Sequence, residues 1–471
     1  MNERQSIQKM DRRRFLRSAT AVSAGLVLAP TVRSAASPTA GASDDSPLHV
    51  ALIGAGAQGQ VLMDACRRIP GIRFEAVCDI WEAYNLRRGY RILQRCGHPA
   101  RPYTDYEEML HREENLDAAI VATPDCWHAR HTIACLDAGL HVYCEAPMSN
   151  GVEDARRMVQ AARRTGKLLQ IGHQRRSNPQ YRFCYERFLH EVTLLGRIIA
   201  VNGQWNRGAQ APLGWPRQAP VDPAVLSKYG YESMERFRNW RWYKGLGSGP
   251  VVDLGSHQLD VYNWFLDARP VSVLASGYIN QPNCAGHEWC DTVMAIYDYR
   301  TPQGAVAASY QVLSGNRYEG YVEKFLGDKG TLAISHRSDR TRLYPDWVGG
   351  QMAQWVAFLK EGYLTVPPEW RVWLEQQRVT EERLAEAFAG LFVLESPEGI
   401  DLDRLSCSVP IKMDTPPHQP HLENFFDAIR GEAELACPAK IGYEAVVTVL
   451  KVNEAIAAGR RLDFAPGDFV V

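Results

Sequence analysis

The sequence predicts an α/β protein in which a doubly wound parallel sheet precedes a second α/β domain with a mostly antiparallel, open sheet. Apolar runs and helical patterns alternate from residue 48 to residue 171, which is typical of a parallel sheet covered by helices. Beyond residue 172, four segments alternate in polarity or are rich in β-branched and aromatic residues, which favours antiparallel strands. The 471 residues are sufficient for two such domains.

A glycine-rich turn separates the first expected strand from the first expected helix. The apolar residues 48–53 predict a strand that is buried on both faces, and a G-x-G-x-x-G motif at 54–59 follows directly. Gly54 permits the tight turn, Gly56 lets the backbone approach a pyrophosphate, and Gly59 allows the helix to pack closely on the strand. The N-terminus of the helix would offer free N–H groups to the phosphates.

An acidic residue ends the second expected strand, at 74–78. Asp79 stands twenty residues after Gly59, where a carboxylate can accept hydrogen bonds from both hydroxyls of a ribose. Asp79 could instead cap the following helix. A Rossmann domain that binds a dinucleotide is predicted, because a strand, the glycine turn, a helix, a second strand and an acidic residue follow in the required order. No arginine follows Asp79 immediately, which favours NAD over NADP.

The remaining elements of the Rossmann domain, predicted to span 48–171, follow in order. Ligands of such sheets bind at the carboxyl ends of the strands, which should therefore surround one crevice. The expected helices lie at 82–94, 103–110, 128–138 and 152–165, and the further strands at 118–122, 140–144 and 168–171. The residues predicted to surround the crevice are Gly54, Asp79, Thr123, Pro124, Glu145 and His173.

The second domain, predicted to span 172–471, is the candidate for substrate binding and oligomerisation. An aromatic and basic stretch at 231–243 precedes a helix at 253–265. Residues 335–406 are interpreted as an insertion of loops and helices, and two amphipathic helices close the chain. The expected strands lie at 197–205, 271–277, 289–299, 304–312, 321–326 and 331–334.

The N-terminus has the features of an export signal. Residues 1–36 contain a twin arginine before Phe15-Leu16, a short apolar stretch and a small-residue cleavage candidate. The apolar stretch is too short to cross a bilayer, so no permanent membrane anchor is expected. We predict a signal peptide at 1–36 that is recognised by the twin-arginine export machinery, a linker at 37–47, and a periplasmic location.

Charge and cysteine content exclude several classes of function. The formal net charge is −1, so no basic field indicates a nucleic-acid partner. The eleven cysteines are odd in number and scattered, which argues against a disulfide framework. No metal site is assigned.

The chain resembles the Gfo/Idh/MocA oxidoreductases over most of its length. Besides the glycine turn, the resemblance rests on Ala122-Thr123-Pro124, Cys144-Glu145-Ala146-Pro147, Gly172-His173-Gln174-Arg175, Asp253-Leu254-Gly255-Ser256-His257-Gln258-Leu259-Asp260 and His421-Leu422-Glu423-Asn424-Phe425. An exported subset with a motif like Asn239-Trp240-Arg241-Trp242 is the most similar. The resemblance implies a tightly bound NAD, a carbohydrate substrate and a homodimer or homotetramer.

One motif departs from the family pattern. Where the family has Glu-Lys-Pro, this chain has Ala146, which cannot donate or accept a proton as the family lysine does. The family's Asp-x-x-x-His matches at Asp253 and His257, and the i, i+4 spacing places both on one helical face. His257 could remove a hydroxyl proton, and Asp253 could orient or polarise it. The two could instead be a helix N-cap and a core histidine, and Lys244 or Lys324 could replace the missing ammonium.

These patterns give three groups of candidate site residues. The candidate catalytic residues are His257, Asp253 and Glu145, of which Glu145 could also be purely structural. The candidate cofactor-binding residues are Gly54, Gly56, Gln58, Gly59, Asp79, Thr123, Pro124, His128, Glu145 and Gln174. The candidate substrate-binding residues, whose aromatic members could instead pack in the core, are Arg175, Trp205, Asn206, Trp240, Arg241, Trp242 and Asp260.

Three functions remain open at this point. The first is an exported NAD-dependent oxidoreductase that acts on a hydroxyl of a sugar, polyol or glycoside. The second resembles the NAD-dependent retaining α-N-acetylgalactosaminidases, which oxidise a sugar hydroxyl, eliminate the aglycone, add water and reduce again. Glu145 matches their glutamate, but their histidine lies in a different motif. The third is a catalytically silent sugar-binding member of the family.

Overall fold

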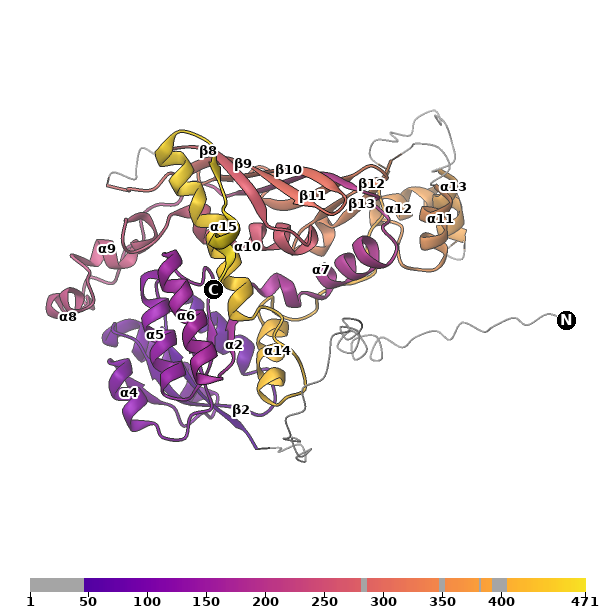
Figure 1. Ribbon diagram of the computed structural model, residues 1–471. Coiled ribbons are helices and arrows are strands. Elements are labelled where there is room, and N and C mark those ends of the chain that lie inside the picture. Colours follow the sequence, from indigo (N-terminus) through magenta and orange to yellow (C-terminus); the bar gives the residue numbers. More distant parts are fainter. Residues whose placement is uncertain (1–45, 281–285, 347–351, 381–382, 392–404) are drawn as a thin grey trace, which may run out of the picture.

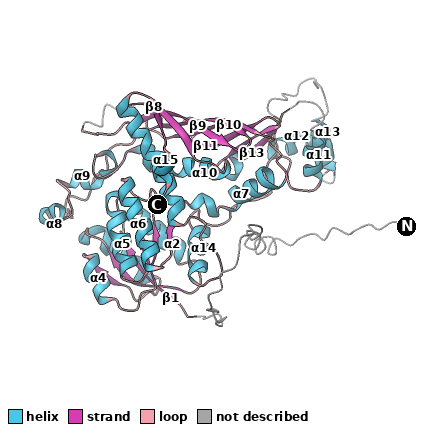
Figure 2. Ribbon diagram, viewed as in Figure 1, coloured by secondary structure: helices cyan, strands magenta, loops and turns pink. Residues whose placement is uncertain are grey.

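The computed structural model describes residues 46–280, 286–346, 352–380, 383–391 and 405–471 (Figure 1). The predicted signal peptide and nearly all of the predicted linker lie outside these residues. Two sheets organise the described chain, and Figure 2 shows the helices that surround them. No helix of the described part is both long and apolar enough to cross a bilayer.

The N-terminal sheet has six parallel strands in the order β3-β2-β1-β4-β5-β6. The order reverses between β1 and β4, which creates the crevice where doubly wound sheets bind their ligands. The expected Rossmann sheet is therefore confirmed. Its strands are β1 (Leu48–Ile53), β2 (Ile72–Cys78), β3 (Arg101–Tyr103), β4 (Ala118–Val121), β5 (His141–Cys144) and β6 (Leu169–Ile171).

Helices cover both faces of this sheet. One of them begins later and another begins earlier than the sequence pattern suggested. Residues 101–103 form an edge strand, and the next helix starts only after Asp105, whose side chain accepts from two N–H groups of the first turn. The helix expected from 128 begins at Asp125, where an acidic residue suits a helix N-terminus. The helical elements are α2 (Ala57–Cys66), η1 (Glu82–Leu86), α3 (Arg87–Arg95), α4 (Tyr106–Arg112), α5 (Asp125–Asp137) and α6 (Val152–Thr165).

The second sheet has eight strands in the order β13-β12-β11-β7-β10-β9-β8-β14. Only β7 and β10 pair in parallel, so the expected mostly antiparallel sheet is confirmed. Its strands are β7 (Ile198–Asn206), β8 (Pro270–Tyr278), β9 (Thr292–Thr301), β10 (Gly304–Leu313), β11 (Tyr321–Gly327), β12 (Gly330–Ile334), β13 (Arg342–Pro345) and β14 (Leu462–Asp463).

One face of this sheet is covered and the other is not. Helices α10 (Pro250–Phe265) and α15 (Ala439–Ala458) pack together and against the sheet, and they lie between it and the N-terminal domain (Figure 1). Apolar side chains on the strands alternate in burial, as expected for one buried face. Leu274, Met294 and Ile296, on β8 and β9, are about half exposed.

The connections place further elements around this frame. After β6 come η2 (Gln174–Ser177), α7 (Pro179–Phe183) and η3 (Cys184–Glu191). Helix α14 (Gln419–Ile429) returns to the N-terminal sheet, where Leu422, Phe425 and Phe426 enter its core. The remaining helices are α8 (Pro223–Lys228), α9 (Met234–Arg238), η4 (Trp240–Trp242), η5 (Ser338–Arg340), α11 (Met352–Lys360), α12 (Pro368–Gln376), α13 (Leu384–Leu391) and η8 (Pro466–Phe469).

Candidate active site

A cavity of about 530 Å³ lies at the carboxyl edge of the parallel sheet, where α10 faces it. Residues from both domains line this cavity, although up to 365 positions, from Ile53 to His418, separate them along the chain. Most of the candidate residues converge here: Gly54, Gly56, Gln58, Asp79, Thr123, Pro124, His128, Glu145, Gln174, Trp205, Trp240, Arg241, Asp253 and His257.

The glycine turn fits the shape that a dinucleotide requires. Gly54 has φ +96°, and a Cβ there would lie 2.6 Å from the carbonyl oxygen of Ala122. A Cβ at Gly59 would lie 1.9 Å from the carbonyl oxygen of Gly54, so only glycine allows α2 to approach the turn. No side chain caps α2 at Gly56, which leaves its first N–H groups for an anion.

Asp79 is fixed at the end of β2 and connects it to the glycine turn. Its Oδ2 accepts from the N–H of Ala55 at 2.9 Å and from Asn85 Nδ2 at 3.3 Å, and its Oδ1 accepts from the N–H of Trp81 at 2.8 Å. Burial raises the pKa of Asp79 to about 6, although the two backbone hydrogen bonds act in the opposite direction. The carboxylate therefore stays ionised at neutral pH and can accept from ribose hydroxyls.

Glu145 is held by the first domain at the end of β5. Its Oε1 accepts from Gln58 Nε2 at 2.8 Å, and its Oε2 accepts from the N–H of Ala146 at 3.1 Å. Gln58 Nε2 also lies 3.1 Å from Nε2 of His418. Gln58 thus connects the N-terminus of α2 with Glu145 and with His418 of a distant segment. These two contacts give a structural role to the amide two residues after Gly56.

His257 enters the cavity from α10 as a neutral base. Burial holds the pKa of His257 well below its usual value, and the neighbouring His173 adds to the effect. The two rings are edge to face with centroids 5.5 Å apart. Nδ1 of His257 has no hydrogen-bond partner among the described residues. A neutral imidazole lining the cavity can accept a proton at pH 7.

Asp253 does not orient His257, contrary to the expectation from their spacing. Both carboxylate oxygens of Asp253 lie 3.1 Å from Nε of Arg241, which donates to them. The sequence could not show this pairing, because Arg241 belongs to a different element from α10. Asp253 therefore acts on Arg241 and not on the imidazole.

Four candidate substrate-binding residues lie outside the cavity lining. Asp260 is buried in an ion pair with Arg176, and Asn206 donates to the carbonyl oxygen of Tyr318 at 2.9 Å. Trp242 stacks on His287, with the ring centroids 4.2 Å apart. Arg175 is the fourth. These side chains are committed to protein partners that the sequence motifs did not reveal.

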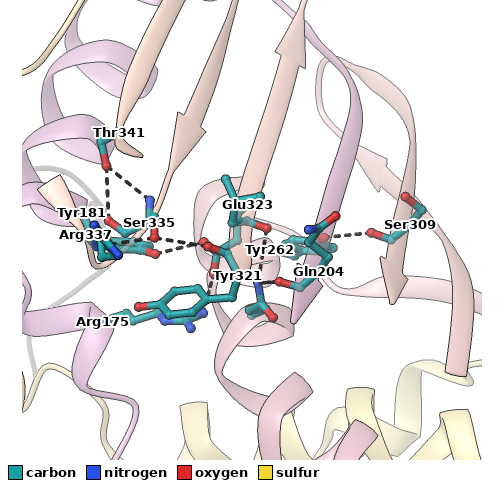
Figure 3. Close-up of polar contacts among 12 residues, drawn as sticks. Arg175, Tyr181, Gln204, Tyr262, Ser309, Tyr321, Glu323, Ser335, Arg337 and Thr341 are labelled. Atoms are coloured by element: carbon teal, nitrogen blue, oxygen red, sulfur yellow. Dashed lines mark hydrogen bonds and ion pairs between the residues drawn. The ribbon is translucent and has the colours of Figure 1, made fainter. Parts of the chain in front are cut away.

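Arg175 forms a buried ion pair with Glu323 of β11 (Figure 3). Tyr181 also donates to Glu323 at 2.9 Å, and the Arg175 guanidinium lies 4.8 Å from the ring centre of Tyr321. Trp205, which lines the cavity, stacks on Tyr321. The Arg175 guanidinium also lies 5.5 Å from the ring centre of Trp205, so Arg175 contacts a cavity residue without lining the cavity itself.

The structure adds cavity residues that the sequence analysis missed. Asp125 directly follows Pro124 and is buried, and this burial together with the charge of Asp253 raises its pKa well above the usual range. Its position next to the Thr123-Pro124 motif was a usable signal. His418 and Arg238 carried no local signal, because each reaches the cavity from a distant segment. The missed lining residues with titratable side chains include Asp125, His131, Arg238 and His418.

Residues 207–246, here called the strap, close one side of the cavity. The strap leaves β7, crosses to the N-terminal domain with α8 and α9, and returns to α10 (Figure 1). Trp81 donates from Nε1 to the carbonyl oxygen of Ala219 at 2.7 Å, and Lys228 pairs with Asp105 at 2.8 Å. An apolar cluster unites Trp81 with the strap residues Val221, Leu226, Tyr229, Tyr231, Met234, Phe237 and Trp240.

Comparison with protein families finds two matching models. Residues 48–173 match an oxidoreductase family with an NAD-binding Rossmann fold, and residues 193–333 match the GFO/IDH/MocA C-terminal domain. Together these matches cover more than half of the chain. The expected NAD-binding domain is confirmed.

The individual relatives share less than a third of their residues with this chain over the matched segments. An inositol 2-dehydrogenase from Rubrobacter xylanophilus is 26% identical over 298 residues, 62% of this chain and 72% of that protein. An α-N-acetylgalactosaminidase from Shewanella oneidensis is 29% identical over 178 residues, 34% of this chain and 39% of that protein. The WlbA dehydrogenase from Chromobacterium violaceum, solved with NADH and UDP-GlcNAcA, shares the fold with a TM-score of 0.60. It is 20% identical, and the match covers 90% of this chain and 97% of that one.

Binding of NAD should weaken in acid because of Asp79. The ionised carboxylate would accept from ribose hydroxyls, so affinity should be constant above pH 7 and fall as the pH drops through about 6. Asp79→Asn should weaken binding by about 1.5–3 kcal/mol and remove this pH dependence. Titration of intrinsic fluorescence with NAD between pH 5 and 8 measures both effects. Equal pH profiles for the two proteins would contradict the assignment.

The Arg175–Glu323 pair should be structural. Glu323→Leu leaves a buried guanidinium without its partner and should lower the free energy of unfolding by about 3–5 kcal/mol. The double variant Arg175→Met/Glu323→Leu should recover most of that loss, because no unpaired charge remains buried. Urea unfolding of both proteins tests this. A double variant as unstable as Glu323→Leu would argue against the pairing.

Proposed function

The chain belongs to the Gfo/Idh/MocA family of oxidoreductases, and from this premise we propose that it oxidises a hydroxyl group of a sugar, polyol or glycoside with NAD. One observation carries the proposal. A single cavity contains the glycine turn and Asp79 of the first domain together with the neutral His257 of the second. The relatives include an inositol dehydrogenase, whose substrate is a polyol.

Different residues would bind the cofactor and move the proton in this reaction. The glycine turn and the N-terminus of α2 would hold the pyrophosphate of NAD, and Asp79 would hold a ribose. When bound, NAD supplies the hydride acceptor. His257 takes the hydroxyl proton, which a neutral imidazole can do at pH 7. Glu145, fixed by Gln58, borders the same end of the cavity and orients the reacting group.

Redox-neutral cleavage of a glycoside is the second candidate, and the strap is the observation that favours it. The strap is attached to the N-terminal domain through Trp81 and Lys228, and its residues line the cavity. A dinucleotide enclosed in this way would leave slowly and stay for many turnovers. Oxidation of one hydroxyl acidifies the neighbouring C–H, Glu145 can remove that proton as the aglycone leaves, and water addition and reduction complete the cycle.

We further propose that the protein is exported to the periplasm and forms a homodimer or homotetramer. The sequence of residues 1–36 supports twin-arginine export, which carries folded proteins and would allow NAD to be loaded first. The half-exposed Leu274, Met294 and Ile296 on the uncovered face of the second sheet support self-association.

Turnover of defined probes should identify the reaction. We expect activity on at least one of myo-inositol, methyl α-D-glucopyranoside and p-nitrophenyl N-acetyl-α-D-galactosaminide. An increase in the absorbance of the reduced nicotinamide indicates net oxidation. Release of nitrophenol without such an increase indicates redox-neutral cleavage. His257→Ala should lower kcat by about 10²–10⁴-fold while NAD binding stays intact. Inactivity of the wild-type protein on all three probes would contradict the proposal and favour a silent binding protein.

NAD should remain with the protein during purification because of the strap. Trp81→Phe removes the hydrogen bond to Ala219 and should accelerate NAD loss about fivefold, as expected for one hydrogen bond of about 1 kcal/mol. Trp370→Phe in α12, outside the strap and the cavity lining, is the matched control and should change nothing. NAD remaining after timed dialysis measures the effect. Rapid loss from the wild-type protein would argue against a retained cofactor.

A further inference from the structure

The cavity has an alanine where the resemblance implied a lysine, but its lining contains other basic side chains. Ala146 lines the cavity at the position for which the resemblance implied a lysine. Among the described lining residues, Arg238 and Arg241 are the two with a permanently charged basic side chain. Arg238 lies over the ring of Trp81, 5.1 Å from its centre, and its charge acts on Asp79 at the ribose end. Arg241 is therefore the remaining cation, and its turn contacts the loop that contains Ala146 through Asn150.

Arg241 is fixed through one edge of its guanidinium. Nε donates to both oxygens of Asp253 at 3.1 Å, and Cζ lies 4.2 Å from the ring centre of Trp240. The backbone is also packed closely, because a Cβ at Gly247 would lie 2.7 Å from the Cα of Arg241. The two terminal NH2 groups donate to no acceptor in the described part of the chain. The side chain is thus oriented, while its terminal donors stay free for a ligand.

The turn that follows Arg241 is docked onto the loop that contains Ala146. Asn150 donates from Nδ2 to the carbonyl oxygen of Gly245 at 3.4 Å, and Ser248 donates to the carbonyl oxygen of Asn150 at 3.5 Å. The carboxylate of Asp253 contacts the Arg241 guanidinium and stabilises its charge.

We propose that Arg241 replaces the missing lysine as the positive charge that binds the substrate oxygen undergoing oxidation. This inference rests on the proposed function. An oxygen that loses its proton gains negative charge, and the free NH2 groups of the guanidinium can donate charge-assisted hydrogen bonds to it. Guanidinium does not release its proton at neutral pH, so the proton goes to His257 and the two tasks are separated.

Two consequences follow for neighbouring residues. Asp253 is a positioning residue, because it acts on the substrate only through the orientation of Arg241. The lysines that the sequence offered as replacements do not line the cavity. Lys324 lies 3.9 Å from Glu319, and Lys244 lies over the ring of Trp289.

Chemical rescue tests the role of Arg241 in the holoenzyme. On the probe that the wild-type protein turns over, Arg241→Ala should lower kcat about 10²–10³-fold. Guanidinium chloride added at millimolar concentration should raise the kcat of this variant at least tenfold, a response that a structural role would not produce. Lys244→Met is the matched control and should keep wild-type kcat. NAD affinity of Arg241→Ala should stay within twofold of wild type, which also reports that the variant is folded.

A second pair of variants moves the charge instead of removing it. Adding Ala146→Lys to Arg241→Met should recover at least tenfold in kcat, because the ammonium returns to the position that the resemblance implied. Asp253→Asn should lower kcat about tenfold and should not respond to guanidinium, since Arg241 is still present. The inference is overturned if Arg241→Ala keeps wild-type kcat, or if neither guanidinium nor Ala146→Lys restores activity. A wild-type protein inactive on all three probes overturns the proposed function instead.

Discussion

A buried ion pair between Arg176 and Asp260 fixes the position of α10, and the site depends on it. Arg176 lies in η2, directly after the last strand of the parallel sheet, and Asp260 lies one turn beyond His257. The guanidinium donates three hydrogen bonds of 2.8–3.0 Å to the carboxylate, which is 1% exposed. Two charges removed from water tolerate only a precise geometry, so the pair holds α10 against the carboxyl edge of the sheet.

That constraint explains how one cavity can combine two different electrostatic environments. On the side of the first domain, Asp79 and Glu145 are satisfied by hydrogen bonds from the glycine turn, from Gln58 and from backbone N–H groups. On the side of the second domain, Nδ1 of His257 is buried with no partner among the described residues, and desolvation holds the pKa of this imidazole well below its usual value. The glycine turn and the imidazole thus line one cavity, an arrangement suited to the proposed oxidation of an alcohol.

The strap gives the site a further property that the two sheets alone would lack. It contributes aromatic side chains to the cavity and is joined to the N-terminal domain by a hydrogen bond, an ion pair and an apolar cluster. It also carries Arg241 to the reactive end. The proposed cofactor retention and the proposed replacement of the missing lysine therefore depend on the same segment, and both rest on contacts between distant parts of the chain.

The sequence by itself determined the alternation of strands and helices around the glycine turn, the position of Asp79 and the presence of His257 on a helix, because each of these depends on local spacing, although it missed the edge strand at 101–103. It could not determine that Asp253 pairs with Arg241, that Arg175 and Asp260 are consumed in buried ion pairs, or that His418 reaches Gln58. The tertiary structure decided these. The partners are 12 to 360 positions apart, and which charge meets which is set by how the two domains and the strap pack.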